Sequence, residues 1–516
     1  MSRGSLSALA AKALVLTHRW LGIGGGLLFV AWFVSGIVMV FARMPAVDPA
    51  DRLARLPALD LTAATVSPWE AAVAAEVDPQ RVRMGMLLGR PVYRLARGAG
   101  WVTVYADTGR PLVSLDPQQA LDIAGRWAPK LRSTSRHEGL VTEPDQWTLL
   151  SRDLLPLHLI GLGDAAATRI SVSGTSGEIV METTASSRRW ATCGAVLHWL
   201  YFTPIRSHGL LWNRVLLGAA LVGCVLTLSG LAWGVWQIAP KRRDGRSAGT
   251  PYTGLLRWHH YAGLVFGLFT FGWALSGALS LDPWRWHPGS SPSRQQSEAV
   301  AGGRLRFDLL TLERIRAAHA ALGADFSPRE LEVIQLGGHP HLLAYSPNGA
   351  PRPRAALTPS DIDSPVQPFP SRIASLETLG GYAASFDRHD IEAAADRAMP
   401  RHRATERRWL DAYDAYHYDR HGLGPLPVLR VKYDDPQSTW LYLDPATGRI
   451  LQRLQRLSRL NRWLYRGLHS LDFPLLYARP VLWHFVIIIL LAGGLLLSST
   501  TLLPGWRRLR RRFSAR

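Results

Sequence analysis

The stretch His18-Arg-Trp-Leu-Gly22 opens a long apolar run that ends at Trp32-Phe-Val-Ser35-Gly36. A second version begins at His259-His-Tyr-Ala-Gly263 and ends at Trp273-Ala-Leu-Ser276-Gly277. One constant interval superimposes the His, Gly, Trp, Ser and Gly positions, which indicates an internal duplication. Each copy begins a membrane span with an imidazole, a group that is costly in lipid unless it has a partner.

Four stretches of the 516-residue chain are strongly apolar and almost uncharged, at about 14–41, 210–238, 255–281 and 481–503. Each is long enough for the roughly 20 residues that a helix needs to cross a hydrocarbon core. The first stretch exceeds the apolar region of a signal peptide and lacks a small-x-small cleavage site, so we interpret it as an anchor. The sequence therefore predicts a membrane protein with four transmembrane α-helices in two duplicated halves.

The net charge is +20, and groups of basic residues lie next to the predicted spans. Their positions predict the topology of the chain in the membrane. Basic residues near the spans are Arg3, Lys12, Arg19, Lys241, Arg242, Arg243, Arg246 and the run from Arg507 to Arg512. Short basic flanks stay in the cytoplasm, so both termini and the loop near 240–254 are expected inside. No nucleic-acid-binding module accompanies the charge, and we expect no nucleic-acid partner.

The two long segments between spans are then expected to be external α+β domains. Helical patterns occur at about 67–76, 116–128 and 309–322. Strand-turn-strand patterns with a Gly turn occur at 93–112, 170–179 and 440–450. The stretches 284–304 and 347–370 are predicted loops.

This pattern divides the chain into five parts. They are 1–43 (cytoplasmic N-terminus and first span), 44–200 (external domain), 201–282 (second and third spans with a basic cytoplasmic loop), 283–472 (external domain) and 473–516 (fourth span and basic cytoplasmic tail). Each external domain is expected to end in a short helix at the outer membrane surface.

That short helix carries a second repeated histidine. Leu197-His198-Trp-Leu-Tyr-Phe202 corresponds to Leu468-His469-Ser-Leu-Asp-Phe473, and a proline follows each string within two residues. We expect the proline to break the helix before the chain enters the membrane. The duplication predicts a pseudo-twofold axis along the membrane normal.

Such an axis brings His18 to the depth of His259 on the cytoplasmic side, and His198 to the depth of His469 on the external side. Two imidazoles at equal depth suit the axial positions of a haem iron, so we predict two b-type haems. Small surfaces for a macrocycle, or equally for tight helix packing, are offered by Gly22, Gly24, Gly25, Gly26, Gly263 and Gly267. Covalent haem attachment and cysteine-ligated metal are excluded, because the only cysteines are Cys193 and Cys224.

Alternatives to this ligand set remain open. Each histidine could instead be a hydrogen-bonded interfacial residue. His260 lies beside His259 on the same helix and could replace it as ligand. His484 lies inside a span but, like His208, has no duplicated partner.

The chain resembles the PepSY-associated transmembrane proteins. The resemblance covers nearly the whole chain and rests on five strings: the openings at His18 and at His259, Leu426-Pro-Val-Leu-Arg-Val431, Asp444-Pro-Ala-Thr-Gly448 and Arg462-Trp-Leu-Tyr-Arg-Gly-Leu-His469-Ser-Leu-Asp-Phe-Pro474. The better understood members resemble bacterial inner-membrane reductases of ferric siderophores that carry haem b. The resemblance therefore implies PepSY-like periplasmic domains and a ferric siderophore or other iron chelate as electron acceptor.

The leading hypothesis is thus an inner-membrane haem oxidoreductase in contact with membrane lipid. Its electron donor is expected to be separate, either quinol or a cytoplasmic reductase, because the chain has no flavin or nicotinamide domain of its own. No acid–base catalytic residues are expected. The rival is a non-redox PepSY membrane protein that binds or regulates a periplasmic protease or senses a ligand. Transport is disfavoured because the spans lack acidic residues and broken-helix signs.

The sequence contains three weaker signals. Gly161-Leu-Gly163-Asp-Ala-Ala166 resembles a dinucleotide fingerprint without its βαβ frame. Trp284, Trp286 and His287 could line a substrate surface or belong to an aromatic belt. A metal, a ferric chelate or only solvent is expected at the polar cluster Asp411, Tyr413, Asp414, Tyr416, His417, Tyr418, Asp419 and His421.

Overall fold

The computed structural model describes residues 3–98, 100–149, 152–238, 249–347, 371–420 and 424–514. The chain divides into two compact units. The helical unit comprises Met1–Arg43, Arg189–Pro288 and Arg459–Arg516, and the sheet unit comprises Met44–Arg188 and Gly289–Ser458. The basic residues at 241–246, almost all of the loop predicted at 347–370, and His421 lie outside the described residues.

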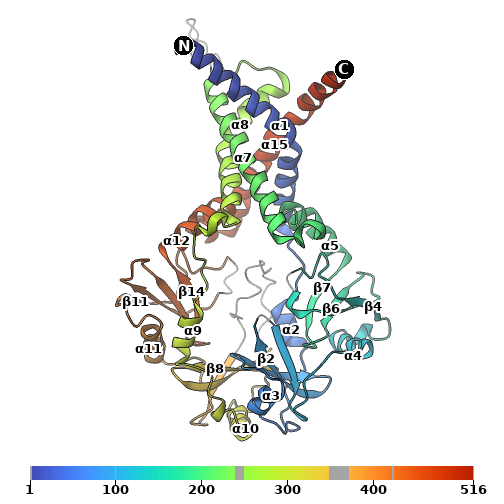
Figure 1. Cartoon of the computed structure of the whole chain (residues 1–516), viewed down its shortest axis with the longest axis vertical. Helices are drawn as coiled ribbons and strands as arrows, with labels where there is room; N and C mark the ends of the chain where they lie inside the picture. The colour runs from blue at the N-terminus through green and yellow to red at the C-terminus, as the bar shows by residue number, and fades with distance from the viewer. Residues whose placement is uncertain are drawn as a thin grey trace. The chain divides into compact units, whose positions relative to one another are not determined.

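Four helices of the helical unit are long and apolar enough to cross a membrane. They are α1 (Arg3–Phe41), α7 (Gly209–Trp236), α8 (Gly254–Ser280) and α15 (Pro480–Phe513), all labelled in Figure 1. A helix pairs its own backbone polar groups, which is why such apolar runs adopt this structure in lipid. The prediction of four helices with the length and composition of membrane spans is confirmed.

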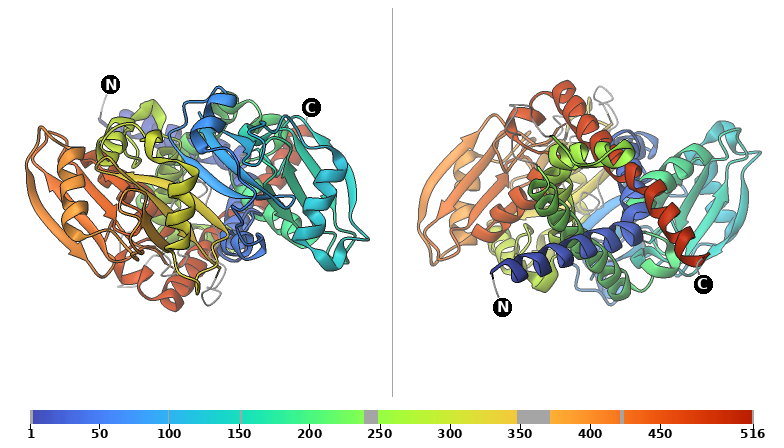
Figure 2. Two further views of the ribbon diagram at one scale, coloured as in Figure 1. Left: turned by 90° about the horizontal axis from the view of Figure 1, so that it is seen from below. Right: turned by 90° about the horizontal axis from the view of Figure 1, so that it is seen from above.

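The four long helices form a bundle in which each helix packs against the helices next to it in the chain, and α15 closes the bundle against α1. Helices α7 and α15 each pack against both α1 and α8, so α1 and α8 lie diagonally (Figure 2, right). Several glycines permit this packing: a Cβ on Gly223 would lie 3.0 Å from the Phe29 ring, and one on Gly267 would lie 2.8 Å from Leu231. Glycine therefore serves helix packing at these positions.

A broken passage precedes α7, and a corresponding one precedes α15. The first runs from α5 (Ala185–Ala191) through a π-helical turn (Thr192–Val196) to α6 (Thr203–Arg206). The second runs from α12 (Arg456–Arg462) through a π-helical turn (Trp463–Gly467) and α13 (Leu468–Ser470) to α14 (Pro474–Tyr477). His198 and His469 follow the two π-helical turns, so the predicted short helical segment ending near each histidine is present.

The sheet unit contains three antiparallel sheets. The six-stranded sheet has the order β10-β9-β8-β1-β2-β3, and the four-stranded sheets have the orders β4-β5-β6-β7 and β11-β12-β13-β14. The strands of the large sheet are β1 (Val82–Leu87), β2 (Arg90–Arg97), β3 (Gly100–Tyr105), β8 (Glu330–Leu336), β9 (His339–Tyr345) and β10 (Ser371–Ser375). The others are β4 (Arg136–Val141), β5 (Leu157–Gly161), β6 (Arg169–Ser173), β7 (Ile179–Thr183), β11 (Ala404–Leu410), β12 (Val428–Tyr433), β13 (Trp440–Asp444) and β14 (Arg449–Leu454).

Short helices cover these sheets. They are α2 (Pro49–Arg55), α3 (Pro68–Ala74), α4 (Pro117–Trp127), α9 (Arg294–Ala301), α10 (Leu312–Ala320) and α11 (Arg388–Ala398), with 3-10 turns at Pro129–Leu131, Arg152–Leu154 and Phe307–Leu309. A further 3-10 turn, Pro283–Arg285, follows α8 in the helical unit. The three predicted helices correspond to α3, α4 and α10. Asp116 caps α4 and forms a capping box with Gln119, which explains where this helix begins.

The two segments that were predicted as separate external domains share the six-stranded sheet. Strand β1 pairs with β8, with Arg83 directly opposite Glu332. In Figure 2, left, the strands of the first segment are blue and those of the second are yellow. Both segments therefore contribute to one compact unit.

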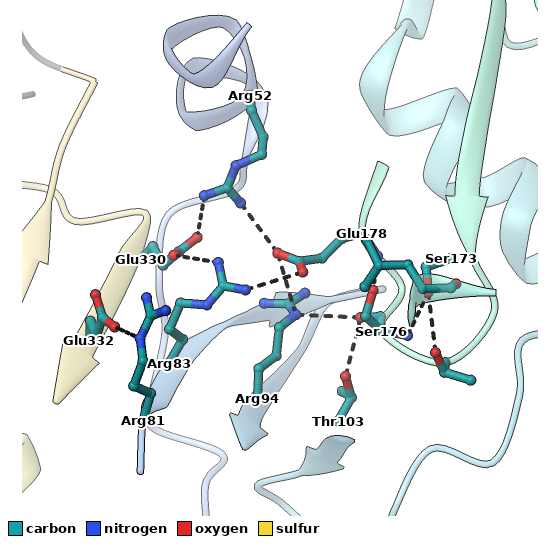
Figure 3. Close-up of polar contacts among 12 residues, drawn as sticks. Arg52, Arg81, Arg83, Arg94, Thr103, Ser173, Ser176, Glu178, Glu330 and Glu332 are labelled. Carbon is teal, nitrogen blue, oxygen red and sulfur yellow. Dashed lines mark hydrogen bonds and ion pairs between the residues drawn. The ribbon is translucent and has the colours of Figure 1, made fainter. Parts of the chain in front are cut away.

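An ion network surrounds the β1–β8 pairing (Figure 3). Glu330 accepts from Arg52 at 2.8 Å and from Arg83 at 3.2 Å. Glu332 accepts from Arg81 at 2.9 Å and from Arg449 at 2.8 Å. Burial by itself would raise the pKa of both carboxyl groups, but these guanidinium groups lower it to about 2.

Candidate cofactor site: two histidine pairs in the helical unit

The first histidine pair consists of His18 on α1 and His259 on α8. Their ring centres lie 6.0 Å apart across the bundle, with the ring planes tilted by 34°. The Nδ1 atom of His18 lies 3.0 Å from the carbonyl oxygen of Leu226 on α7. The Nδ1 atom of His259 lies 3.2 Å from the carbonyl oxygen of Leu497 on α15. The two rings therefore face each other from diagonal helices, and each is held by a flanking helix.

These carbonyl contacts fix the tautomer of both rings. A carbonyl oxygen only accepts, so each Nδ1 carries the proton and each Nε2 keeps its lone pair. The His18 ring packs directly against the backbone of Gly230 on α7. A Cβ at that position would overlap His18 Cε1. The first pair thus presents two metal-competent nitrogens.

The second histidine pair consists of His198 and His469, with ring centres 6.1 Å apart and ring planes at 77°. Ser35 Oγ lies 3.1 Å from Nδ1 of His198, and Ser276 Oγ lies 3.0 Å from Nδ1 of His469. Each serine hydroxyl also donates to the carbonyl three residues earlier, at Trp32 or Trp273. With its own proton used in this way, each serine accepts the Nδ1 proton, so Nε2 is again left with its lone pair.

Tryptophan holds the backbone of the second pair. The indole Nε1 of Trp32 donates to the carbonyl of His198 at 3.0 Å, and that of Trp273 donates to His469 at 2.9 Å. The backbone after each histidine is left-handed, at Leu200 (φ 47°) and Leu471 (φ 53°). Left-handed leucine is unfavourable, and with the two π-helical turns it marks a strained geometry that recurs in both copies.

The histidines of the second pair lie outside the spanning helices, and burial lowers the pKa of His198 to about 4 and that of His469 to about 3. Both imidazoles are therefore neutral at pH 7, the form that binds metal. The surrounding core is apolar and includes Phe33, Leu471 and Leu491.

The ring spacing of both pairs matches that of two ligands on one metal ion. An imidazole nitrogen lies about 2.0 Å from a bound metal and about 1.1 Å from its own ring centre. Two axial imidazoles on one iron thus place their ring centres about 6.2 Å apart. The observed spacings are 6.0 and 6.1 Å. The donor set, tautomers and spacing fit axial ligation of haem iron.

His260, His484 and His208 lie apart from the two pairs. His260 uses both ring nitrogens, Nδ1 with Thr250 Oγ1 at 2.7 Å and Nε2 with the carbonyl of Gly234 at 2.8 Å. His484 is exposed, with Nδ1 2.7 Å from the carbonyl of Pro480. His208 is also exposed. The geometry therefore favours His259 over His260 as the partner of His18.

The polar cluster at 411–421 has a structural explanation. Asp414 accepts from the backbone of Tyr416 and His417 and from the side chains of Arg430 and Tyr442, at 2.7 to 2.9 Å. Its two oxygens are thereby fully used. Within the described ranges, no group of three or more His, Cys, Asp or Glu is arranged to hold a metal ion.

The structure also shows where the other two weak sequence signals lie, the string beginning at Gly161 and the tryptophans at 284 and 286. The string beginning at Gly161 forms the turn between β5 and β6, where Asp164 accepts from Thr168. This is a hairpin turn, in agreement with the missing βαβ frame. Trp284 is 86% exposed and has a φ of 60°, and Trp286 Nε1 donates to Leu279 at 3.4 Å.

Ser35 and Ser276 are functional candidates to which the sequence interpretation gave no role. Both belong to the repeated Trp-x-x-Ser string on which the predicted duplication rests. That repetition was the available signal, but the partner of the hydroxyl group lies 163 positions away for Ser35 and 193 for Ser276. No protein-family model and no curated protein matches this chain.

Proposed function

We propose that this chain is a transmembrane haem-b oxidoreductase, related to the PepSY-associated proteins, with one haem at each histidine pair. The observation that carries the proposal is the facing of two imidazoles, twice, with Nε2 free and ring centres 6.0 and 6.1 Å apart. Single interfacial histidines need no such matched geometry. Within the second pair His198 and His469 make the same contacts with Trp and Ser, which also supports the proposed internal duplication.

The proposed location is the bacterial inner membrane, with both termini in the cytoplasm and the sheet unit in the periplasm. Support comes from the basic residues that flank the spans. On this orientation the first pair lies toward the cytoplasmic side and the second toward the periplasmic side. Electrons enter from quinol or a separate cytoplasmic reductase.

Haem b, when bound, supplies a one-electron couple between Fe(III) and Fe(II). The chain's own residues hold that group and control its environment. Leu226, Leu497, Ser35 and Ser276 keep each Nδ1 protonated, which would leave each Nε2 free to hold the haem iron. The apolar core that includes Phe33, Leu471 and Leu491 provides a surrounding of low polarity near the second pair.

The proposed acceptor is a ferric siderophore or another iron chelate. One electron converts its Fe(III) to Fe(II), which hard oxygen ligands hold less tightly, so iron is released. No proton transfer by a side chain is required. The proposed class of acceptor comes from the PepSY resemblance.

The test is an optical spectrum of the full chain, purified in detergent from haem-replete cells. We expect a b-type α band in the reduced-minus-oxidised spectrum and two haems per chain after extraction. Absence of that band would contradict the proposal and favour a non-redox PepSY protein that restrains a protease or senses a ligand. Oxidation of the reduced protein by a ferric chelate, followed in the same band, tests the acceptor separately.

A further inference from the structure

The two histidine pairs differ in what accepts the Nδ1 proton. In the first pair the nearest acceptors are backbone carbonyls of α7 and α15, and Thr500 Oγ1 lies slightly farther from His259 Nδ1, at 3.3 Å. In the second pair they are the hydroxyl groups of Ser35 and Ser276. A side chain can be removed by substitution, whereas a backbone carbonyl cannot. In the second pair the nearest acceptors are therefore side chains, which substitution can remove.

Both serines lie in the interior of the helix bundle. Ser35 and Ser276 are each 0% exposed, so water cannot replace the hydroxyl group. Gly36 and Gly277 follow them, and a Cβ at either position would lie 3.8 Å from the Cε1 atom of the paired histidine. Each imidazole therefore packs against the Ser-Gly dipeptide of its helix.

An acceptor on Nδ1 changes the electronic character of the ring. It draws the proton away from Nδ1, which increases electron density at Nε2 and strengthens its bond to a metal. A stronger donor stabilises Fe(III) relative to Fe(II) and lowers the reduction potential. Loss of the acceptor should have the opposite effect.

We infer that Ser35 and Ser276 are positioning residues that hold the second histidine pair in its Nδ1-protonated form and set the reduction potential of that site independently of the first. This inference rests on the proposed haem ligation. It assigns the two serines a role that the ligand set alone does not require. Because the same three-group contact of Trp carbonyl, Ser hydroxyl and His Nδ1 occurs twice, two separate substitutions test it.

The experiment is a redox titration of the full-length holoprotein followed by optical spectra, on wild type, Ser35→Ala and Ser276→Ala. The matched control is Ser280→Ala, since Ser280 lies one turn beyond Ser276 on α8 and donates to a helix carbonyl at 2.7 Å without touching a histidine. We expect two resolved potentials in wild type. In each Ser→Ala variant the potential of one haem should rise while the other stays constant. The control should match wild type.

The outcomes separate this inference from the proposed function. Wild type without haem overturns the proposed function itself. Two haems with unchanged potentials in both variants overturn the inference and leave the function standing, and so does an equal shift of both potentials. Loss of a single haem in Ser35→Ala or Ser276→Ala, with both haems retained in Ser280→Ala, supports the positioning role.

Discussion

In the helical unit each histidine pair is built from two copies of the same residues, whereas the junction of β1 and β8 in the sheet unit brings opposite charges together. Gly89-Arg-Pro91 after β1 corresponds to Gly338-His-Pro340 after β8, so Arg83 corresponds to Glu332 and Arg81 to Glu330. By the Gly177 and Gly448 turns, Glu178 corresponds to Arg449. The charge is inverted at all three positions.

The contacts of the sheet unit follow the same correspondence. The pair Arg83–Glu178, at 3.4 Å, corresponds to Glu332–Arg449, at 2.8 Å. The pair Arg81–Glu332, at 2.9 Å, corresponds to Glu330–Arg83, at 3.2 Å. The geometry is thus retained while the signs are exchanged.

The difference between the units follows from what lies at each junction. A metal ion, as proposed for the histidine pairs, would accept the same donor from both sides, so identical histidines would suit it. The antiparallel pairing of β1 with β8 places Arg83 opposite its own counterpart Glu332, and identical charges directly opposite would repel. Opposite charges make the two halves complementary to each other.

The largest expected effect comes from substituting one of the histidines that are proposed as haem ligands. His198→Ala should lower the haem content from two to one per chain, and His18→Ala should remove the other haem, because each iron needs both axial nitrogens. Haem extraction and the α-band intensity measure this content. His208→Ala and His260→Ala should keep two haems. If all four variants lose haem alike, the ligand assignment is wrong.

In the sheet unit the corresponding change is Glu332→Arg, which restores identical charge at the β1–β8 junction. The introduced guanidinium would then face Arg83 and lie beside Arg81 and Arg449, at a position where the side chain is almost fully buried. Loss of one partner from a buried pair costs about 3–5 kcal/mol, and the reversal should cost more. We expect a large fall in the thermal midpoint of the full chain, or failure to fold.

Two milder substitutions should cause smaller losses of stability than Glu332→Arg. Glu332→Gln removes the charge without reversing it and should destabilise less than Glu332→Arg. Asp78→Asn breaks an exposed pair with Arg304, whose side chains are 79% and 88% exposed, and should change nothing measurable. Equal stability of Glu332→Arg and Asp78→Asn would refute the role of the network.

Acid provides a reversible form of the same test. The pKa values of Glu330 and Glu332 are lowered from 4.5 to about 2, so their stabilising effect is present above about pH 4.5 and is lost as the pH falls toward 2. Hydrogen exchange in the full chain should show β1 and β8 losing protection across this window before β5 and β6 do. Uniform loss of protection in all four strands would argue against a local effect of this network.

The smallest expected effect concerns the tryptophans that hold the second histidine pair. Trp32→Phe and Trp273→Phe each remove one hydrogen bond to a histidine carbonyl and keep most of the ring packing. We expect a loss of about 1 kcal/mol each in the free energy of unfolding. Trp284→Phe, at an 86% exposed position, is the control and should be neutral. A larger loss in Trp284→Phe than in Trp32→Phe would contradict this assignment.

The amino-acid sequence was sufficient to locate the four long helices, three short helices and the repeated histidines. Apolar length determines a spanning helix, and capping residues such as Asp116 determine where a short helix begins, so both are local properties. Gly109, Gly177 and Gly448 were expected in turns, and all three adopt a positive φ of 66° to 69°. The two repeats, each with its own constant interval, indicated which histidines to pair.

The tertiary structure decided the remaining features because they depend on residues far apart in the chain. The diagonal placement of α1 and α8 brings His18 to His259, and the carbonyls of Leu226 and Leu497 determine which ring nitrogens are free. The pairing of β1 with β8 joins two segments that the sequence predicted as separate domains. Backbone acceptors and strand partners carry no local sequence signal, since any residue supplies the same carbonyl and the same amide.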